Sequence, residues 1–124
     1  MTPLVCRLDL WVNPIFDELI TESAKLLVLP THGNVEHTRA QLAQAHAYLA
    51  SAAKDELPRE WFVSHDLLRH CPNLLCVSSS GAGYDTIDVA ACTEAGVAVV
   101  NQAGMNADSV AEHTFALLLA VQRR

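Results

Sequence analysis

Two glycine-marked segments carry the residues that could bind a small anion. Gly81-Ala82-Gly83 and Gly104 each lie between a strand-like apolar run and a helix-like pattern. In a strand–loop–helix junction, glycine lets the backbone approach a ligand closely, and loop N–H groups can point at a negative charge. Both segments are therefore candidate anion-binding loops, while a tight turn without a ligand would leave the same pattern.

The first segment also has the beginning of a GxGxxG dinucleotide-binding fingerprint. Thr86 stands where the third glycine belongs, and no acidic residue closes a following strand about 20 residues on. A nucleotide fingerprint is therefore not expected here. We expect Asp85 to cap the next helix, with Asp88 in its first turn, where a carboxylate favours the helix dipole.

The second segment runs from Asn101 to Asp108. Its Asn106 offers an amide donor and an acceptor, although a simple loop that ends in a helix cap is the alternative. Glu112 and His113 follow at adjacent positions of a predicted helix. Adjacent helical side chains point about 100° apart, so this pair is not assigned to catalysis.

Composition excludes several classes of function. The net charge is −6 with only 8 Lys plus Arg and no basic cluster, which argues against a nucleic-acid partner. The longest apolar run, Phe115 to Val121, is far shorter than the roughly 20 residues that span a bilayer, so no membrane partner is expected. The four cysteines fit no zinc spacing. We expect no metal site, free thiols and a cytoplasmic location.

Apolar runs and helical periodicity alternate along the chain. Strands are expected over 5–10, 26–29, 47–53, 74–77 and 97–100. Helices are expected from Asn13-Pro14, over 35–45, from Trp61 to before Pro72, over 87–95 with Gly96 as cap, and from the capping-box pattern at Ser109. This βα alternation predicts an α/β fold, a flavodoxin-like doubly wound parallel sheet of five strands. Ligands of such sheets bind beyond the carboxyl ends of the strands.

The sequence GAGYDTIDVAACTEAGVAVVN followed by GMNADSVAEHTFALLL resembles the D-isomer-specific 2-hydroxyacid dehydrogenases. The resemblance is strong over 74–124, and over 1–73 it is limited to the order and spacing of elements. It implies that residues 1–101 are the N-terminal part of a substrate-binding domain. It further implies that residues 102–124 are a hinge and the start of a crossing helix that leads to an NAD(P)-binding Rossmann domain outside this sequence.

The same resemblance implies roles for particular residues. The loop Gly81, Ala82 and Gly83 would hold the carboxylate of a small 2-oxo or 2-hydroxy acid through backbone N–H groups. Ala82 would also lie against the nicotinamide end of NAD or NADP. Asn106 would face the active site, and Val110 would approach the cofactor.

The chain carries none of the family's downstream groups: the GxGxxG turn, the ribose-binding acid, the catalytic arginine, the assisting glutamate and the catalytic histidine. No catalytic residue is therefore assigned, and the chain alone is expected to be inactive and to bind cofactor weakly. Many members carry an arginine after the third strand, where this chain has Ser51-Ala52-Ala53-Lys54. Which 2-hydroxy acid is used, and whether the cofactor is NAD or NADP, stays open.

Two non-enzymatic alternatives remain. A flavodoxin-like ligand-sensing module is one, although the aspartate and lysine of a phosphorylated receiver are missing from the ends of the third and fifth strands. A dimerising module is the other, because the last helix is apolar almost all round from Val110 to Val121 and needs a cover. A homodimer or the Rossmann domain would supply that cover.

Overall fold

The fold comes from a computed structural model that describes residues 1–123. The strands are β1 (Leu4–Leu8), β2 (Lys25–Leu29), β3 (Ala47–Ala50), β4 (Cys76–Ser79) and β5 (Ala98–Val100). The helices are α1 (Pro14–Thr21), α2 (Val35–Leu42), α3 (His65–His70), α4 (Val89–Glu94) and α5 (Ala107–Gln122), with a 3₁₀ turn at Arg59–Trp61. All five strands are parallel in the order β2-β1-β3-β4-β5. The predicted flavodoxin-like parallel sheet is confirmed.

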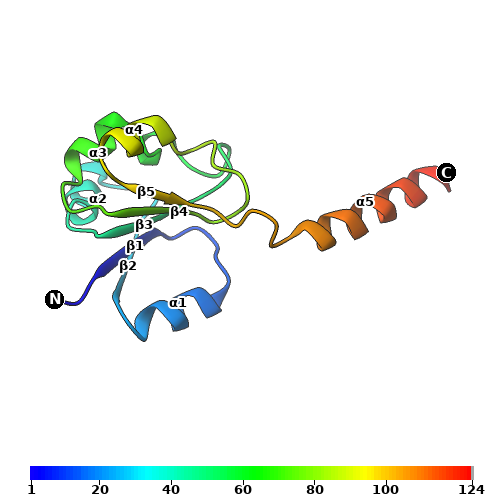
Figure 1. Cartoon of the computed structure of the whole chain (residues 1–124), viewed down its shortest axis with the longest axis horizontal. Helices are drawn as coiled ribbons and strands as arrows, with labels where there is room; N and C mark the ends of the chain where they lie inside the picture. The colour runs from blue at the N-terminus through cyan, green and yellow to red at the C-terminus, as the bar shows by residue number, and fades with distance from the viewer. Residues whose placement is uncertain (124) are drawn as a thin grey trace.

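Helices cover the two faces of the sheet unequally. Figure 1 shows α2, α3 and α4 on one side of the sheet and α1 on the other. The core lies under the three helices, where alternate residues of the strands, such as Cys6, Tyr48 and Val77, meet Leu42 of α2 and Leu67 of α3. Strand residues alternate between faces, so the opposite face carries the intervening side chains.

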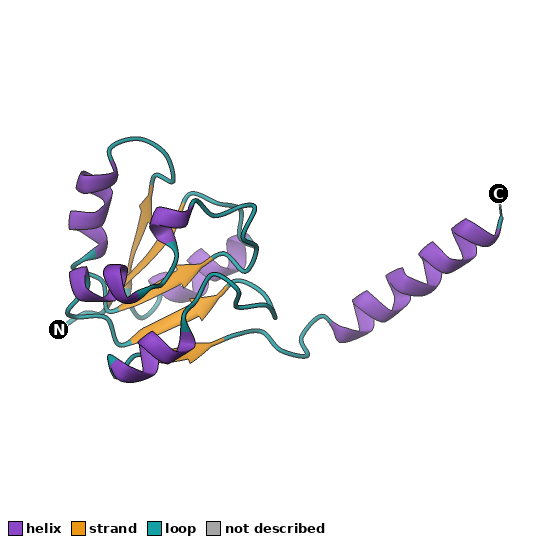
Figure 2. Cartoon of the chain, turned by 90° about the horizontal axis from the view of Figure 1, so that it is seen from above, coloured by secondary structure: helices purple, strands orange, loops and turns teal. Residues whose placement is uncertain are grey.

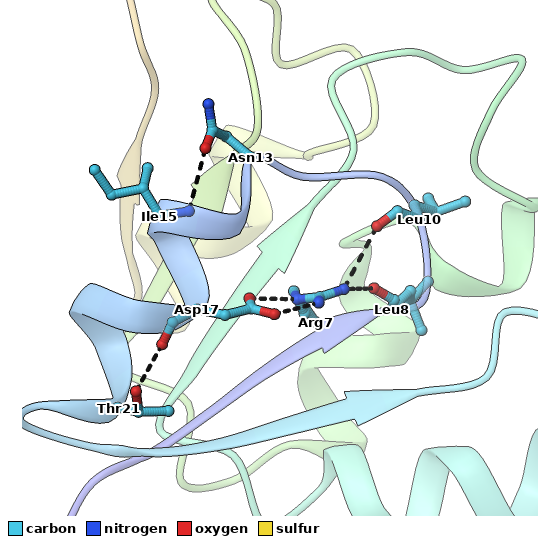
Figure 3. A network of polar contacts seen from close by, with 7 residues as sticks. All are labelled: Arg7, Leu8, Leu10, Asn13, Ile15, Asp17 and Thr21. Carbon is cyan, nitrogen blue, oxygen red and sulfur yellow. Dashed lines mark hydrogen bonds and ion pairs between the residues drawn. The ribbon is translucent and has the colours of Figure 1, made fainter.

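Helix α1 is held to that opposite face by polar contacts as well as by packing. Arg7, on β1, donates to Asp17 on α1 and also to the carbonyls of Leu8, the last residue of β1, and of Leu10 in the loop that follows (Figure 3). Asn13 caps the helix, because its side chain accepts a hydrogen bond from the N–H of Ile15, as the Asn-Pro pair predicts. Arg7 therefore joins β1, the β1–α1 loop and α1.

The third helix differs from the prediction. Residues 59–61 form a 3₁₀ turn, and α3 begins only at His65, after the N-cap Ser64. The indole of Trp61 is buried, and its N–H donates to the carbonyl of Thr31 at 3.0 Å. This long-range hydrogen bond fixes the buried Trp61 side chain to the segment after β2, so that Trp61 acts as an anchor between the two segments. Local apolar periodicity could not indicate this contact.

Other helices and strands also begin or end at residues that differ from the prediction. β3 ends at Ala50, three residues before the predicted end, because the following loop bonds to the β4 side: Ala52 N–H donates to Ser80 Oγ at 3.2 Å. The expected helix cap at Asp85 is wrong. Asp88 caps α4, and its carboxylate accepts from Ala91 N–H at 3.0 Å. The capping-box start at Ser109 is also wrong, since α5 already begins at Ala107.

Helix α5 leaves the sheet domain entirely. It projects away from the sheet after the loop that follows β5 (Figure 2), and none of its 16 residues is buried. Gly104 in that loop has φ +83°, and Gly96, which follows the C-cap residue Ala95 of α4, has φ +71°; both values favour glycine. Among residues 1–123, no helix is both long and apolar enough to cross a bilayer.

Candidate functional site

The carboxyl ends of β3, β4 and β5 meet at one edge of the sheet. The loops that follow them start at Ser51, Ser80 and Asn101. Hydrogen bonds join these loops, since Thr86 Oγ1 donates to Ser51 O at 2.5 Å and Ala52 N–H donates to Ser80 Oγ. In an open parallel sheet this edge is where ligands bind, so these connected loops form the candidate site.

The loop Gly81–Gly83 needs its first glycine for space. Neither Gly81 nor Gly83 has a positive φ in the described chain. A Cβ added to Gly81 would lie 3.1 Å from Ala52 Cβ, whereas one on Gly83 would lie 3.8 Å from Ala52 O. Gly81 therefore lets the loop after β4 pack closely against the loop after β3, a role that the sequence did not indicate.

Each carbonyl of the loop accepts a hydrogen bond from a different donor. Gly81 O accepts from Gln102 N–H at 3.0 Å, and Ala82 O accepts from Asn101 Nδ2 at 2.9 Å. Gly83 O accepts a short hydrogen bond from Ser79 Oγ. All three carbonyls of the loop thus already accept a hydrogen bond from within the protein.

The N–H groups of the same loop are left available. Within residues 1–123, the N–H groups of Ala82, Gly83 and Tyr84 donate to no protein atom, while that of Gly81 makes a long contact of 3.4 Å to Ser79 Oγ. Ala82, Gly83 and Tyr84 are exposed. Free backbone N–H groups on an exposed loop suit a carboxylate, which accepts hydrogen bonds at both oxygens.

Comparison with known proteins decides the family. Residues 13–123 match the family described as "D-isomer specific 2-hydroxyacid dehydrogenase, catalytic domain". This chain belongs to that family. The expected resemblance is therefore confirmed over most of the chain.

Individual relatives agree with the family. A glyoxylate/hydroxypyruvate reductase of Arabidopsis thaliana is 30% identical over 108 residues, which cover 87% of this chain and 32% of that protein. A glyoxylate reductase of Thermococcus litoralis is 42% identical over 62 residues, 50% of this chain and 19% of the relative. The crystal structure of a 2-hydroxyacid dehydrogenase from Ketogulonicigenium vulgare matches with TM-score 0.74 and 28% identity over 97% of this chain and 36% of that one. This chain thus spans a third or less of the two curated relatives.

Two of the residues expected at the site belong to the start of α5. Asn106 is the N-cap residue of α5, but its side chain makes no capping hydrogen bond. Val110 lies in the first turns of α5 and is 55% exposed. In the part of the chain that the structure describes, no hydrogen bond joins either residue to the loop. A role for them in this dehydrogenase family member depends on what α5 packs against.

Side chains add little positive charge next to the loop. Lys54, on the loop after β3, is exposed. It lines a surface hollow together with Arg59, Phe62 and Ser64. Ser51 Oγ donates to a Glu56 carboxylate oxygen at 3.0 Å. Within residues 1–123, this chain thus offers an anion backbone N–H donors and no pocket lined by several cationic side chains close to the loop.

The thiols are poor candidates for nucleophiles. Burial raises the pKa of Cys6 and Cys71 to about 11, and it also raises the pKa of Cys76 and Cys92. A thiol with a raised pKa stays protonated at neutral pH and reacts slowly. Residues 1–123 contain no cluster of three His, Cys, Asp or Glu side chains that could hold a metal ion.

Three residues that shape the loop were missed by reasoning from the sequence. Ser79, Asn101 and Gln102 each donate to one loop carbonyl. The only available signals were the position of Ser79 just before the glycines and an asparagine at the end of the predicted fifth strand. Neither signal identifies the carbonyl that each residue bonds.

Proposed function

We propose that this chain is the substrate-binding part of an NAD(P)-dependent D-2-hydroxyacid dehydrogenase. In this proposal the loop Gly81–Gly83 binds the carboxylate of a small 2-oxo or 2-hydroxy acid. The observation that carries it is the set of free N–H groups at Ala82, Gly83 and Tyr84, on a loop whose carbonyls all bond elsewhere. Family membership supports the same reading.

The chain's own residues would bind and orient the substrate. Hydrogen bonds from Ala82 and Gly83 N–H groups to the carboxylate would fix one end of a short 2-oxo acid, so that its carbonyl carbon is presented in one direction. Such positioning removes rotational freedom before reaction. The proton donor and the group that polarises the carbonyl lie among the downstream residues of the family.

NAD or NADP would supply the hydride when it is bound in the complete protein. A dinucleotide pyrophosphate site needs a glycine turn that opens directly into a helix N-terminus. Here α4 begins only at Val89, and the Asp88 carboxylate already accepts from its Ala91 N–H. This chain therefore does not fit the pyrophosphate, and Ala82 and Val110 are proposed only to contact the nicotinamide end.

The domain organisation proposed is a sheet domain over residues 1–101 and a hinge with a crossing helix over residues 102–124, of which Arg124 lies outside the described residues. Support comes from the end of β5 at Val100, from the positive φ of Gly104 and from the separation of α5 from the sheet (Figure 2). A hinge there would let a second domain close over the loop and exclude water.

Four free cysteines support a cytoplasmic location for the protein.

The substrate proposal is tested by titrating the ¹⁵N-labelled chain with oxamate, a stable analogue of a 2-oxo acid. We expect saturable shifts of the Ala82, Gly83 and Tyr84 amide signals. Ethyl oxamate, the neutral ester, is the matched control and should leave these signals in place. Shifts confined to other parts of the chain, or equal shifts with the ester, would overturn the carboxylate site.

A second function, self-association, is favoured by α5. Phe115, Leu118 and Val121 are 67%, 56% and 65% exposed on a helix that has no buried residue. An apolar helix of this kind is usually covered, and a homodimer is proposed as one cover. Light scattering over a concentration series should then give a dimer mass that Phe115→Asp reduces to a monomer. A monomer at all concentrations contradicts the homodimer and leaves a further domain as the cover.

A further inference from the structure

The three hydrogen bonds to the loop carbonyls also determine where the loop N–H groups point. A peptide unit is planar and trans, so the C=O of one residue and the N–H of the next point in opposite directions. A donor that holds Gly81 O therefore orients the N–H of Ala82. In the same way, a donor on Ala82 O orients the N–H of Gly83.

Asn101 holds the central peptide unit of the loop. Its Nδ2 donates to Ala82 O at 2.9 Å, and its Oδ1 accepts from Ala103 N–H at 3.4 Å. Asparagine suits this position because its side chain carries a donor and an acceptor on one short arm. Asn101 directly follows β5, whose Val100 pairs with Ser78 of β4. The sheet therefore holds the backbone from which the Asn101 side chain extends.

We infer that Asn101 is a positioning residue that aims the N–H of Gly83 at the substrate carboxylate. It acts through the Ala82–Gly83 peptide plane and does not touch the substrate itself. Asn101 also begins the segment that leads to α5, and the next N–H, that of Gln102, holds Gly81 O. The hinge segment is thus bonded to two adjacent peptide units of the loop, which couples the hinge to the binding geometry. This role of Asn101 in binding rests on the proposed function of the loop.

Loss of the Asn101 amide should affect Gly83 more than its neighbours. Without a donor on Ala82 O, the Ala82–Gly83 peptide can rotate and its N–H leaves the carboxylate for part of the time. The Ala82 N–H should stay in place, because the Gln102 backbone still holds Gly81 O. One exposed hydrogen bond is worth about three- to tenfold in affinity, so we expect oxamate to bind about threefold more weakly.

The experiment compares Asn101→Leu, which keeps the shape and neutrality of the side chain but has no donor, with the wild-type chain. Asn73→Ala serves as the matched control, because Asn73 is an exposed asparagine at the opposite edge of the sheet, just before β4. Without ligand, the carbonyl ¹³C shift of Ala82 and the ¹H–¹⁵N heteronuclear NOE of Gly83 report the bond directly. We expect both to change in Asn101→Leu and neither to change in Asn73→Ala, with unaltered spectra elsewhere showing that the variant is folded.

The oxamate titration then separates the two proposals. If wild type binds and Asn101→Leu binds about threefold more weakly, with the largest loss of shift at Gly83, the positioning role is supported. If wild type binds oxamate and Asn101→Leu binds it with the same affinity and the same Gly83 response, the role of Asn101 is overturned while the carboxylate site stands. No oxamate response in wild type overturns the proposed site, and with it the binding role of Asn101. Unchanged Ala82 and Gly83 signals in ligand-free Asn101→Leu would overturn the positioning by themselves.

Discussion

Arg7 and Asp17 form a two-point ion pair that fastens α1 to the sheet. Arg7 Nε lies 2.9 Å from Asp17 Oδ1, and Nη2 lies 2.6 Å from Oδ2 (Figure 3). The third guanidinium nitrogen, Nη1, donates to the carbonyls of Leu8 at 2.9 Å and Leu10 at 3.4 Å. One side chain therefore ties together a strand, the loop after it and a helix that has no buried residue.

Substitution of Arg7 should loosen α1 more than substitution of Asp17. Arg7→Met loses the ion pair and the bonds to the carbonyls of Leu8 and Leu10. Asp17→Asn loses the charge of the pair and one of its two hydrogen bonds, because the amide has a single acceptor oxygen. Amide hydrogen exchange over residues 14–21 should therefore speed up modestly in Asp17→Asn and more in Arg7→Met. Lys25→Met, a change of an exposed cation on β2, is the control. Equal exchange in all three variants would show that packing alone holds the helix.

Asp9 should make stability depend on pH in the acid range. Hydrogen bonds from the Thr31 hydroxyl and from the Thr31 N–H at 2.8 Å hold the pKa of the Asp9 carboxyl below its ordinary value of 3.8. Since the folded-state pKa is the lower one, this stabilisation is present above pH 3.8 and is lost as the pH falls through the folded-state value. The urea midpoint of wild type should thus fall more steeply than that of Asp9→Asn below about pH 4. Parallel curves for the two proteins would contradict this assignment.

The two tryptophans should respond differently to the same substitution. Trp61 is 1% exposed and bonds Thr31 O, whereas Trp11 is 85% exposed. Trp61→Phe leaves a cavity and a buried carbonyl without its donor, so we expect the free energy of unfolding to fall by roughly 2–4 kcal/mol. Trp11→Phe should change it by less than about 0.5 kcal/mol. Chemical denaturation of both variants measures the difference, and similar losses would show that Trp61 is not an anchor.

Sequence patterns predicted those features that short-range physics determines. The parallel arrangement of the five strands follows from βα alternation, and the glycine at position 96 follows from the left-handed geometry that a helix end requires. The roles of Asn101 and Trp61 could not be predicted in this way. Asn101 bonds a carbonyl 19 positions earlier, and Trp61 bonds one 30 positions earlier. Which distant carbonyl a side chain reaches depends on how the loops pack, and periodicity does not contain that information.

Native-state alkylation should distinguish the four cysteines by burial. Cys6 and Cys92 are 0% exposed and Cys71 is 4% exposed, while Cys76 is only partly buried. Because burial raises the pKa of Cys6 and Cys71 to about 11, their thiolate fraction at neutral pH is very small. Iodoacetamide should label Cys76 first, and peptide mass mapping should detect the other three only after unfolding. Labelling of Cys6 at the rate of Cys76 would show that the core opens readily.

The contact between Gly81 and Ala52 should be rescued by a compensating substitution. A methyl group on Gly81 would lie 3.1 Å from Ala52 Cβ, closer than side chains normally pack. Gly81→Ala should therefore shift the loop after β4, lower stability by about 1 kcal/mol and weaken the oxamate response of Gly83. The double variant Gly81→Ala/Ala52→Gly removes the clash and should recover most of both losses, because Gly81 has no positive φ that alanine would resist. Gly83→Ala, whose Cβ would lie at an ordinary 3.8 Å from Ala52 O, is the stability control. If the double variant is no better than Gly81→Ala in urea melts and in the titration, close packing against Ala52 is not the reason for glycine at this position.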